Sequence, residues 1–229
     1  MIRRDFILRM IEEFAQALAR IRSLKRSQRS DEASDALDTE FKRLTGDGAQ
    51  AVARLSEAEL LARLMQDGPT HLVRDKTFML ATLLNEVGEI AASENRMDES
   101  RECHLKALHL LLETLSRGEV FECPEFLPKV EMLKEALRGT PLPPRTQAML
   151  MQHHERTSEF AKAENALFAL LDADPGNDAI MEFGVAFYER LLAQSDMALA
   201  EGALPRAEVE EGLKELQQRR KRGKAQSNQ

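Results

Sequence analysis

The chain has few of the residues that build stacking surfaces. Its 229 residues include no tryptophan and a single tyrosine, Tyr188, and aromatic residues make up 5% of the total. Proteins that bind sugars or single-stranded nucleic acid by stacking need aromatic side chains interleaved with basic ones. We therefore expect Phe183, Phe187 and Tyr188 to pack a helical hairpin against its neighbour.

Cysteine is equally scarce. Cys103 and Cys123 are the only two, and they form no CxxC pair. This spacing excludes a disulfide framework and a zinc ribbon. We expect two free, buried thiols, with a redox pair as the weaker alternative.

Long apolar runs are missing as well. No uninterrupted run approaches the roughly 18 apolar residues of a membrane-spanning helix. The N-terminal MIRRDFILRMIEEFAQALARI superficially resembles a signal peptide, but Asp5, Arg9, Glu12 and Glu13 interrupt its apolar part and no small-residue cleavage site follows. We predict a cytoplasmic protein.

The formal net charge of −7 argues against a surface devoted to nucleic acid, because phosphate binding needs a basic face. The C-terminal QQRRKRGKAQSNQ is a local exception. Cations there also favour a helix C-terminus by offsetting its dipole. A regulatory protein that contacts anionic nucleic acid or membrane through this basic tail stays as an alternative. The basic residues are Arg219, Arg220, Lys221, Arg222 and Lys224.

Catalytic signatures are absent: the chain contains no GxGxxG, GxxxxGK[ST], HExxH or GxSxG. His153 and His154 are adjacent, and neighbouring helical residues point about 100° apart, so both cannot face one ion unaided. His104 follows Cys103 in the same way, and we predict a core or half-buried histidine there. We expect no enzyme, cofactor or metal; the alternative is a catalytic site assembled from distant helices around His104, His153 and His154.

What the chain does contain is helical periodicity. Apolar residues, Met10 and Phe14 among them, recur at three and four positions through the first segment, which places them on one stripe. Ser56 with Glu59 matches a capping box, and Asp98 and Asn177 are expected caps. We predict an all-α fold of about nine or ten helices. Their approximate ranges are 3–27, 31–45, 56–66, 69–94, 98–117, 124–138, 143–157, 160–173, 178–200 and 205–222.

The segment GTPLPP at 139–144 cannot continue a helix, because prolines exclude the helical conformation from the residues before them. It is the best internal boundary. We predict one helical domain over 1–222, with a sub-boundary near 139–144, and a disordered basic and polar tail over 223–229.

Two segments share a spacing that resembles the tetratricopeptide repeat. The first is FAKAENALFALLDADPGN, whose matching slots are Phe160, Ala163, Leu167, Leu170 and Pro175. The second lies upstream, with Gly88 in the slot that Met151 occupies in the first match. The resemblance implies degenerate helical hairpins that stack as an α-α superhelix. The upstream slots are Leu84, Val87, Gly88, Ser100, His104 and Ala107.

Over most of its length the chain also resembles a bacterial family of unknown function with tetratricopeptide-like helices. The residues that carry this resemblance are 4–11 (RDFILRMI), 55–60 (LSEAEL) and 160–165 (FAKAEN). It implies no activity.

In tetratricopeptide proteins the first helix of each hairpin lines a concave groove. The resemblance therefore implies a non-catalytic module that binds a protein or peptide, and an acidic groove favours a basic or amphipathic partner. The wide apolar face of the first helix favours either packing within the chain or a homodimer. The implied groove positions are Asn85, Glu89, Arg145, Gln152, Glu155, Glu182 and Glu189.

Overall fold

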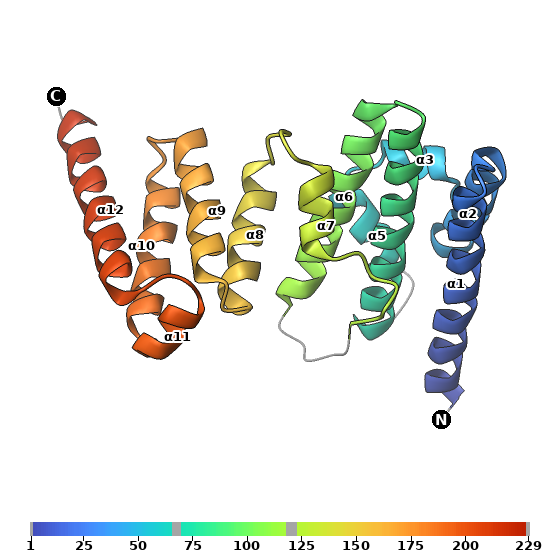
Figure 1. Cartoon of the computed structure of the whole chain (residues 1–229), viewed down its shortest axis with the longest axis horizontal. Coiled ribbons are helices and arrows are strands. Elements are labelled where there is room, and N and C mark those ends of the chain that lie inside the picture. The colour runs from blue at the N-terminus through green and yellow to red at the C-terminus, as the bar shows by residue number, and fades with distance from the viewer. Residues whose placement is uncertain (1, 66–69, 118–122, 228–229) are drawn as a thin grey trace. The chain divides into compact units, whose positions relative to one another are not determined.

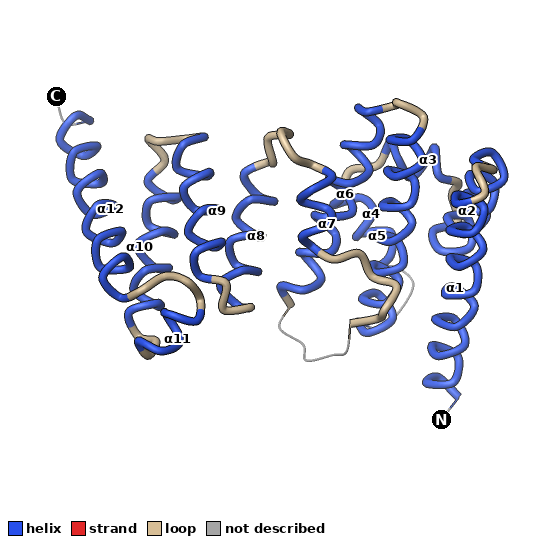
Figure 2. The backbone as a smooth tube through the Cα atoms, in the orientation of Figure 1, coloured by secondary structure: helices blue, strands red, loops and turns tan. Residues whose placement is uncertain are grey.

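The computed structural model describes residues 2–65, 70–117 and 123–227, without the side chains of 2–6, 70–71 and 222–227. Within these ranges all regular structure is helical (Figure 2), so the predicted all-α class is confirmed. Twelve helices are present in the described ranges, against the nine or ten predicted. None of those helices is both long and apolar enough to cross a bilayer.

The chain divides into two compact units, Met1–Pro141 and Leu142–Gln229, which we call unit 1 and unit 2. The division falls inside the predicted boundary at 139–144. Proline explains it, because Pro141 and Pro143 interrupt the helical backbone between the units. Each unit is described by itself.

Unit 1 is built on two long helical hairpins. The helices α1 and α2 form the first and α5 and α6 the second, with α2 also packed on α5 (Figure 1). The apolar stripe of α1 is buried at Phe14, Leu18 and Ile21. The helices are α1 (Ile2–Arg26), α2 (Ser30–Thr45), α3 (Ala49–Arg54), α4 (Glu57–Met65), α5 (Thr70–Ser93), α6 (Met97–Ser116) and α7 (Val130–Ala136).

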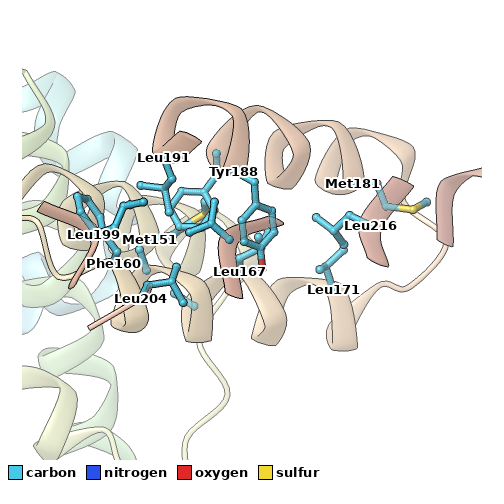
Figure 3. Packing of buried hydrophobic residues seen from close by; sticks show 14 residues of the cluster. Met151, Phe160, Leu167, Leu171, Met181, Tyr188, Leu191, Leu199, Leu204 and Leu216 are labelled. Atoms are coloured by element: carbon cyan, nitrogen blue, oxygen red, sulfur yellow. The ribbon is translucent and has the colours of Figure 1, made fainter. Parts of the chain in front are cut away.

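Unit 2 pairs α8 with α9 and α10 with α12 around an apolar core. Figure 3 shows the Tyr188 ring of α10 pointing toward Leu167 of α9 in this core. Gly184 lets Leu167 and Leu216 approach α10, since an added Cβ would lie 3.0 Å or less from both side chains. The helices are α8 (Pro144–Arg156), α9 (Phe160–Ala173), α10 (Asp178–Leu192), α11 (Asp196–Glu201) and α12 (Arg206–Ser227).

Four connections share one turn. In each, a non-glycine residue adopts the left-handed conformation, and the next residue donates its amide hydrogen to the carbonyl oxygen five positions earlier, at 2.8–3.0 Å. This bond closes a helix C-terminus by satisfying one of its free carbonyl groups. It connects α1 to α2, α5 to α6, α8 to α9 and α11 to α12. The left-handed residues are Gln28 (φ 57°), Asn95 (φ 61°), Ser158 (φ 59°) and Ala203 (φ 57°).

The turns give the two predicted hairpin matches a common register. Asn95 and Ser158 follow Gly88 and Met151 by the same number of residues, so the two positions that we aligned from the sequence are equivalent in their hairpins. In the upstream hairpin the ring of His104 lies over Gly88, where an added Cβ would be 2.7 Å from Cε1. A small residue at Gly88 is therefore required by the packing of His104.

Several helix boundaries differ from the prediction. The capping box of Ser56 and Glu59 and the cap at Asn177 are confirmed. The predicted cap at Asp98 is wrong, because the turn through Asn95 starts α6 at Met97.

Helices also begin and end at unexpected places. The predicted helix 178–200 is split by Ser195, whose hydroxyl caps α11. The helix α3 was not predicted, and α7 begins at Val130 rather than near 124. The last helix extends to Ser227, into the predicted tail. Cys103 is buried as expected, whereas Cys123 is exposed.

Candidate functional site

A groove in unit 1 runs between the N-terminal half of α1 and the first turns of α5, next to the end of α2. We call it the α1–α5 groove. Its volume is about 490 Å³. The floor is apolar and consists of Met10, Phe14, Leu44, Leu72 and Met79. The rim is charged and consists of Arg9, Glu13, Glu40, Arg43 and Lys76.

The groove follows from the unequal lengths of the first two helices. The 25 residues of α1 are paired with only 16 in α2, which at 1.5 Å per residue leaves about 13 Å of α1 beyond its partner. Gly46 ends α2 in the left-handed conformation, with its amide bonded to the Lys42 carbonyl oxygen. Met10 therefore lies near the end of α2, beside Leu44, and remains partly exposed.

The floor of the groove is fixed by aromatic packing on one side. Phe14 is 1% exposed, and its ring meets the ring of Phe126 edge to face, with centroids 5.0 Å apart. Such aromatic pairs stabilise a defined geometry beyond simple burial. This contact fixes the position of the Phe14 ring in the floor of the groove.

The rim combines both signs of charge. Arg43 contacts two glutamates, Glu40 at 2.7 Å and Glu13 at 3.1 Å. Arg9 lies 3.7 Å from Glu13, and its side chain is 69% exposed. Arg43 therefore contacts both carboxylates of the rim, and Arg9 is its most exposed cation.

A second polar feature joins α1 to α5 further along the same two helices. Glu86 is 1% exposed and accepts hydrogen bonds from Arg22, at 2.7 Å, and from Lys25. Lys25 also binds Glu89, and Asn85 donates to Glu89 at 3.0 Å. These residues, Arg22, Lys25, Asn85, Glu86 and Glu89, form what we call the ionic cluster. Every carboxylate in it has a cationic partner, so removing one partner would leave an uncompensated charge at the contact between α1 and α5.

The ionic cluster and its burial shift the pKa values of two groups, Glu89 and the neighbouring His104. Burial acts to raise the pKa of Glu89, but the hydrogen bond and charge of Lys25 and the Asn85 amide outweigh it, so the pKa is lowered. Burial lowers the pKa of His104, although the negative charge of Glu89 opposes that shift. The imidazole is thus held in its neutral form against Gly88, with Nδ1 3.3 Å from the Ser100 hydroxyl oxygen.

The predicted groove positions in unit 1 are Asn85 and Glu89, and the structure brings them together in the ionic cluster. Asn85 is 3% exposed, and Glu89 is exposed but paired with Lys25. Lys25, the partner of Glu89, lies 64 residues away in the sequence, so local spacing gave no sign of it. Their role in binding a partner stays a prediction.

The predicted positions in unit 2 lie on α8 and α10. Gln152 and Glu189 are exposed, and so is Arg145. Glu155 is held by Arg190 through two hydrogen bonds of 2.6 and 2.8 Å, and Glu182 is bound by Arg220 of α12. Gln152 and Glu189 are therefore the best positions for testing this surface by substitution.

The candidate catalytic groups are engaged in the packing of their units. Burial raises the pKa of Cys103 to about 11, which disfavours the reactive thiolate at neutral pH. His104 is buried, as predicted. His154 is 1% exposed, with Nδ1 2.8 Å from a carboxylate oxygen of Glu159. The hydrogen bond from Lys162 lowers the pKa of Glu159 to about 2, with a smaller contribution from His154 and against the opposing effect of burial.

The basic end of the chain is part of α12. Arg219 pairs with Glu215 at 2.6 Å, and Arg220 pairs with Glu182. Both cations therefore face acidic partners on helices of unit 2. The side chains of Arg222 and Lys224 lie outside the described residues.

Sequence reasoning identified Met10 and Phe14 as apolar residues of the first helix but did not place a groove there. The available signal was the difference between the predicted ranges 3–27 and 31–45. It indicates that the first helix is longer than the second, but the third wall of the groove, α5, begins more than twenty residues after the end of α2. The tertiary contact was needed to define the site.

Comparison with known proteins gives one clear result. Neither the curated proteins nor the solved structures contain a match to this chain. Residues 1–221 match the model of a family described as "Family of unknown function (DUF6483)". The match covers nearly the whole chain, including the groove and the ionic cluster. The chain therefore belongs to the family of unknown function DUF6483.

Proposed function

We propose that this protein is a non-catalytic interaction module that binds a segment of another protein in the α1–α5 groove. The observation that carries the proposal is an apolar floor of five side chains, enclosed by charged residues, in a cavity of about 490 Å³. Binding sites are typically concave and mostly apolar, with a few polar groups that fix orientation. The hairpin register and the resemblance to tetratricopeptide repeats also favour an interaction protein.

A helical segment suits this groove best. Its long walls are two helices, α1 and α5, and its lining residues on α1 recur at the helical spacing of Met10, Glu13 and Phe14. An amphipathic helix can lay its apolar side chains on such a floor while its polar face meets solvent. The charged rim then sets the orientation of the bound helix.

The proposal is tested by selecting helical peptides from a display library against the full chain and measuring their affinity by fluorescence anisotropy. Met10→Arg places a charge on the apolar floor and is expected to weaken the selected peptides at least tenfold, about 1.4 kcal/mol. Gln16→Arg is the matched control, because Gln16 is exposed on the same helix and does not line the groove. Circular dichroism checks that both variants keep their helical content.

The result also separates this groove from the surface implied by the repeat resemblance. A variant with Gln152→Arg and Glu189→Arg alters two exposed positions of unit 2 and leaves the α1–α5 groove intact. If binding is lost in this variant and kept in Met10→Arg, the partner binds unit 2 and the groove proposal is wrong. If Met10→Arg and Gln16→Arg weaken binding equally, the groove is also not the site.

A further inference from the structure

The charges around the α1–α5 groove differ from those of the chain as a whole. The full sequence carries a net charge of −7, whereas the rim holds three cationic residues and two anionic ones. Charge of the opposite sign favours encounter and fixes the register of a bound partner. The rim is thus positive by one charge, whereas the chain as a whole is acidic.

The two acidic residues of the rim are already engaged. Arg43 lies between Glu13 and Glu40 and contacts both carboxylates. Glu40 is also largely covered, with its side chain 12% exposed. A basic ligand would have to compete with Arg43 for these carboxylates, and it would meet Arg9 at the edge of the groove.

Arg9 offers the opposite charge in an accessible position. Its guanidinium group is 3.7 Å from Glu13, longer than a hydrogen bond, and 69% of its side chain is exposed. It lies one residue before Met10, so a ligand that covers the apolar floor also passes Arg9. A carboxylate on that ligand can take the two-pronged contact that arginine makes with acidic groups.

From these observations we infer that the occupant of the α1–α5 groove is an acidic amphipathic helix. Its apolar side chains contact the partly exposed Met10 and Leu72, and an acidic residue beside them pairs with Arg9. This inference rests on the proposed function and adds the chemical class of the partner. It differs from the repeat resemblance, which favours a basic or amphipathic partner.

The test uses two synthetic peptides of about 18 residues, long enough to form helix in water. Both carry leucine at the same i, i+4 and i+7 positions; one has glutamate and the other lysine at the flanking positions. The acidic peptide is expected to bind the full chain at least about tenfold more tightly, and this preference should shrink as salt shortens the range of charge interactions from about 8 Å to about 3 Å.

Two variants separate this inference from the proposed function. Arg9→Glu is expected to reverse the preference without changing the fold, and Arg20→Glu, on the exposed surface of the same helix outside the groove, is expected to leave it unchanged. Met10→Arg is expected to weaken both peptides. If both peptides bind equally and Met10→Arg weakens both, the groove binds helices without regard to charge and only the acidic partner is refuted. A preference for the basic peptide also refutes it, and failure of both peptides to bind refutes the helix-binding groove itself.

Discussion

Unit 1 and unit 2 are both helical, yet they fill their interiors differently. Apart from Thr146 and His154, the buried polar and charged residues of the described chain all lie in unit 1, where Glu86 is 1% exposed. The core of unit 2 is apolar, with Tyr188 as its polar member; the Tyr188 hydroxyl donates a hydrogen bond of 2.7 Å to Glu164. The same hairpin construction thus accepts either kind of interior.

Glu89 and Glu164 show how the polar partners in the two units act on a partly buried carboxyl group. Burial acts to raise the pKa of both Glu89 in unit 1 and Glu164 in unit 2. Lys25 reverses that effect for Glu89, whose pKa is lowered. Glu164 has the Tyr188 hydroxyl but lies near the charges of Glu208 and Glu215, so its pKa stays raised. The partner across the helix contact, more than burial, decides which form of the carboxyl group is favoured.

The largest effect is expected from breaking the ionic cluster of unit 1. Glu86→Ala leaves Arg22 and Lys25 without their shared buried partner and is expected to lower the free energy of unfolding by about 3 kcal/mol. Urea unfolding measures the loss, and hydrogen exchange should locate it in α1 and α5. Glu94→Ala, which removes an exposed partner of Arg96, is the control. Equal stability of the two variants would contradict a structural role for the cluster.

The next effect concerns the close approach within the α5–α6 hairpin. Gly88→Ala adds a Cβ 2.7 Å from the His104 ring, and the resulting overpacking is expected to cost about 2 kcal/mol. In a His104→Ala background the same substitution should cost much less, because the ring is gone. Urea unfolding of the four proteins forms a double-mutant cycle, and additive losses would show that the ring does not limit this position.

A smaller effect is expected in unit 2. Tyr188→Phe keeps the packing of the apolar core and removes the hydrogen bond to Glu164, at an expected cost of about 1 kcal/mol. Thermal unfolding measures this change. Leu191→Ala, in the same core, provides a reference for lost packing and should cost more, about 3 kcal/mol. A Tyr188→Phe variant as unstable as Leu191→Ala would make the polar contact the chief support of unit 2.

The smallest effect is a difference in pH dependence between the two units. Because the folded pKa of Glu164 is raised, its contribution to stability is present below the unfolded value of 4.5 and is lost as pH rises through the folded value. The folded pKa of Glu89 is lowered, so its contribution is present above 4.5 and is lost as pH falls through the folded value.

Substituting glutamine removes the titrating carboxyl group of Glu164 or of Glu89, one at a time. As pH rises from about 4 to about 7, the stability of Glu164→Gln relative to the wild type should increase. The stability of Glu89→Gln relative to the wild type should decrease over the same interval. Urea unfolding at both pH values measures the two slopes. If the slopes have the same sign, the contrast between the two carboxylates is wrong.

Local chemistry was largely predictable from the sequence, and distant contacts were not. The caps at Ser56 and Asn177 depend on residues two or three positions away, and both were predicted. The start of α6 was predicted to within one residue, but the cap at Asp98 was wrong, because the turn before the helix is closed by a backbone hydrogen bond from Arg96 to Ala91 and not by a side chain.

The candidate site shows the same division. Met10 and Phe14 were assigned to an apolar stripe, but the groove depends on where α2 ends beside them and on Leu72 of α5. Asn85 and Glu89 were singled out by their place in a repeat, while Lys25, which binds Glu89, came from another hairpin. No local pattern specifies such a pairing, since it is set by how the hairpins pack.

The shared turn has a consequence for recognising distant relatives of this chain. Its left-handed position holds glutamine, asparagine, serine and alanine in the four connections, and among these only asparagine commonly adopts that conformation. A residue-by-residue comparison scores these positions as unrelated, although torsion angle and hydrogen bond are the same in all four. The same backbone turn thus recurs where the side chains differ, so distant relatives are better sought by turn conformation than by residue identity.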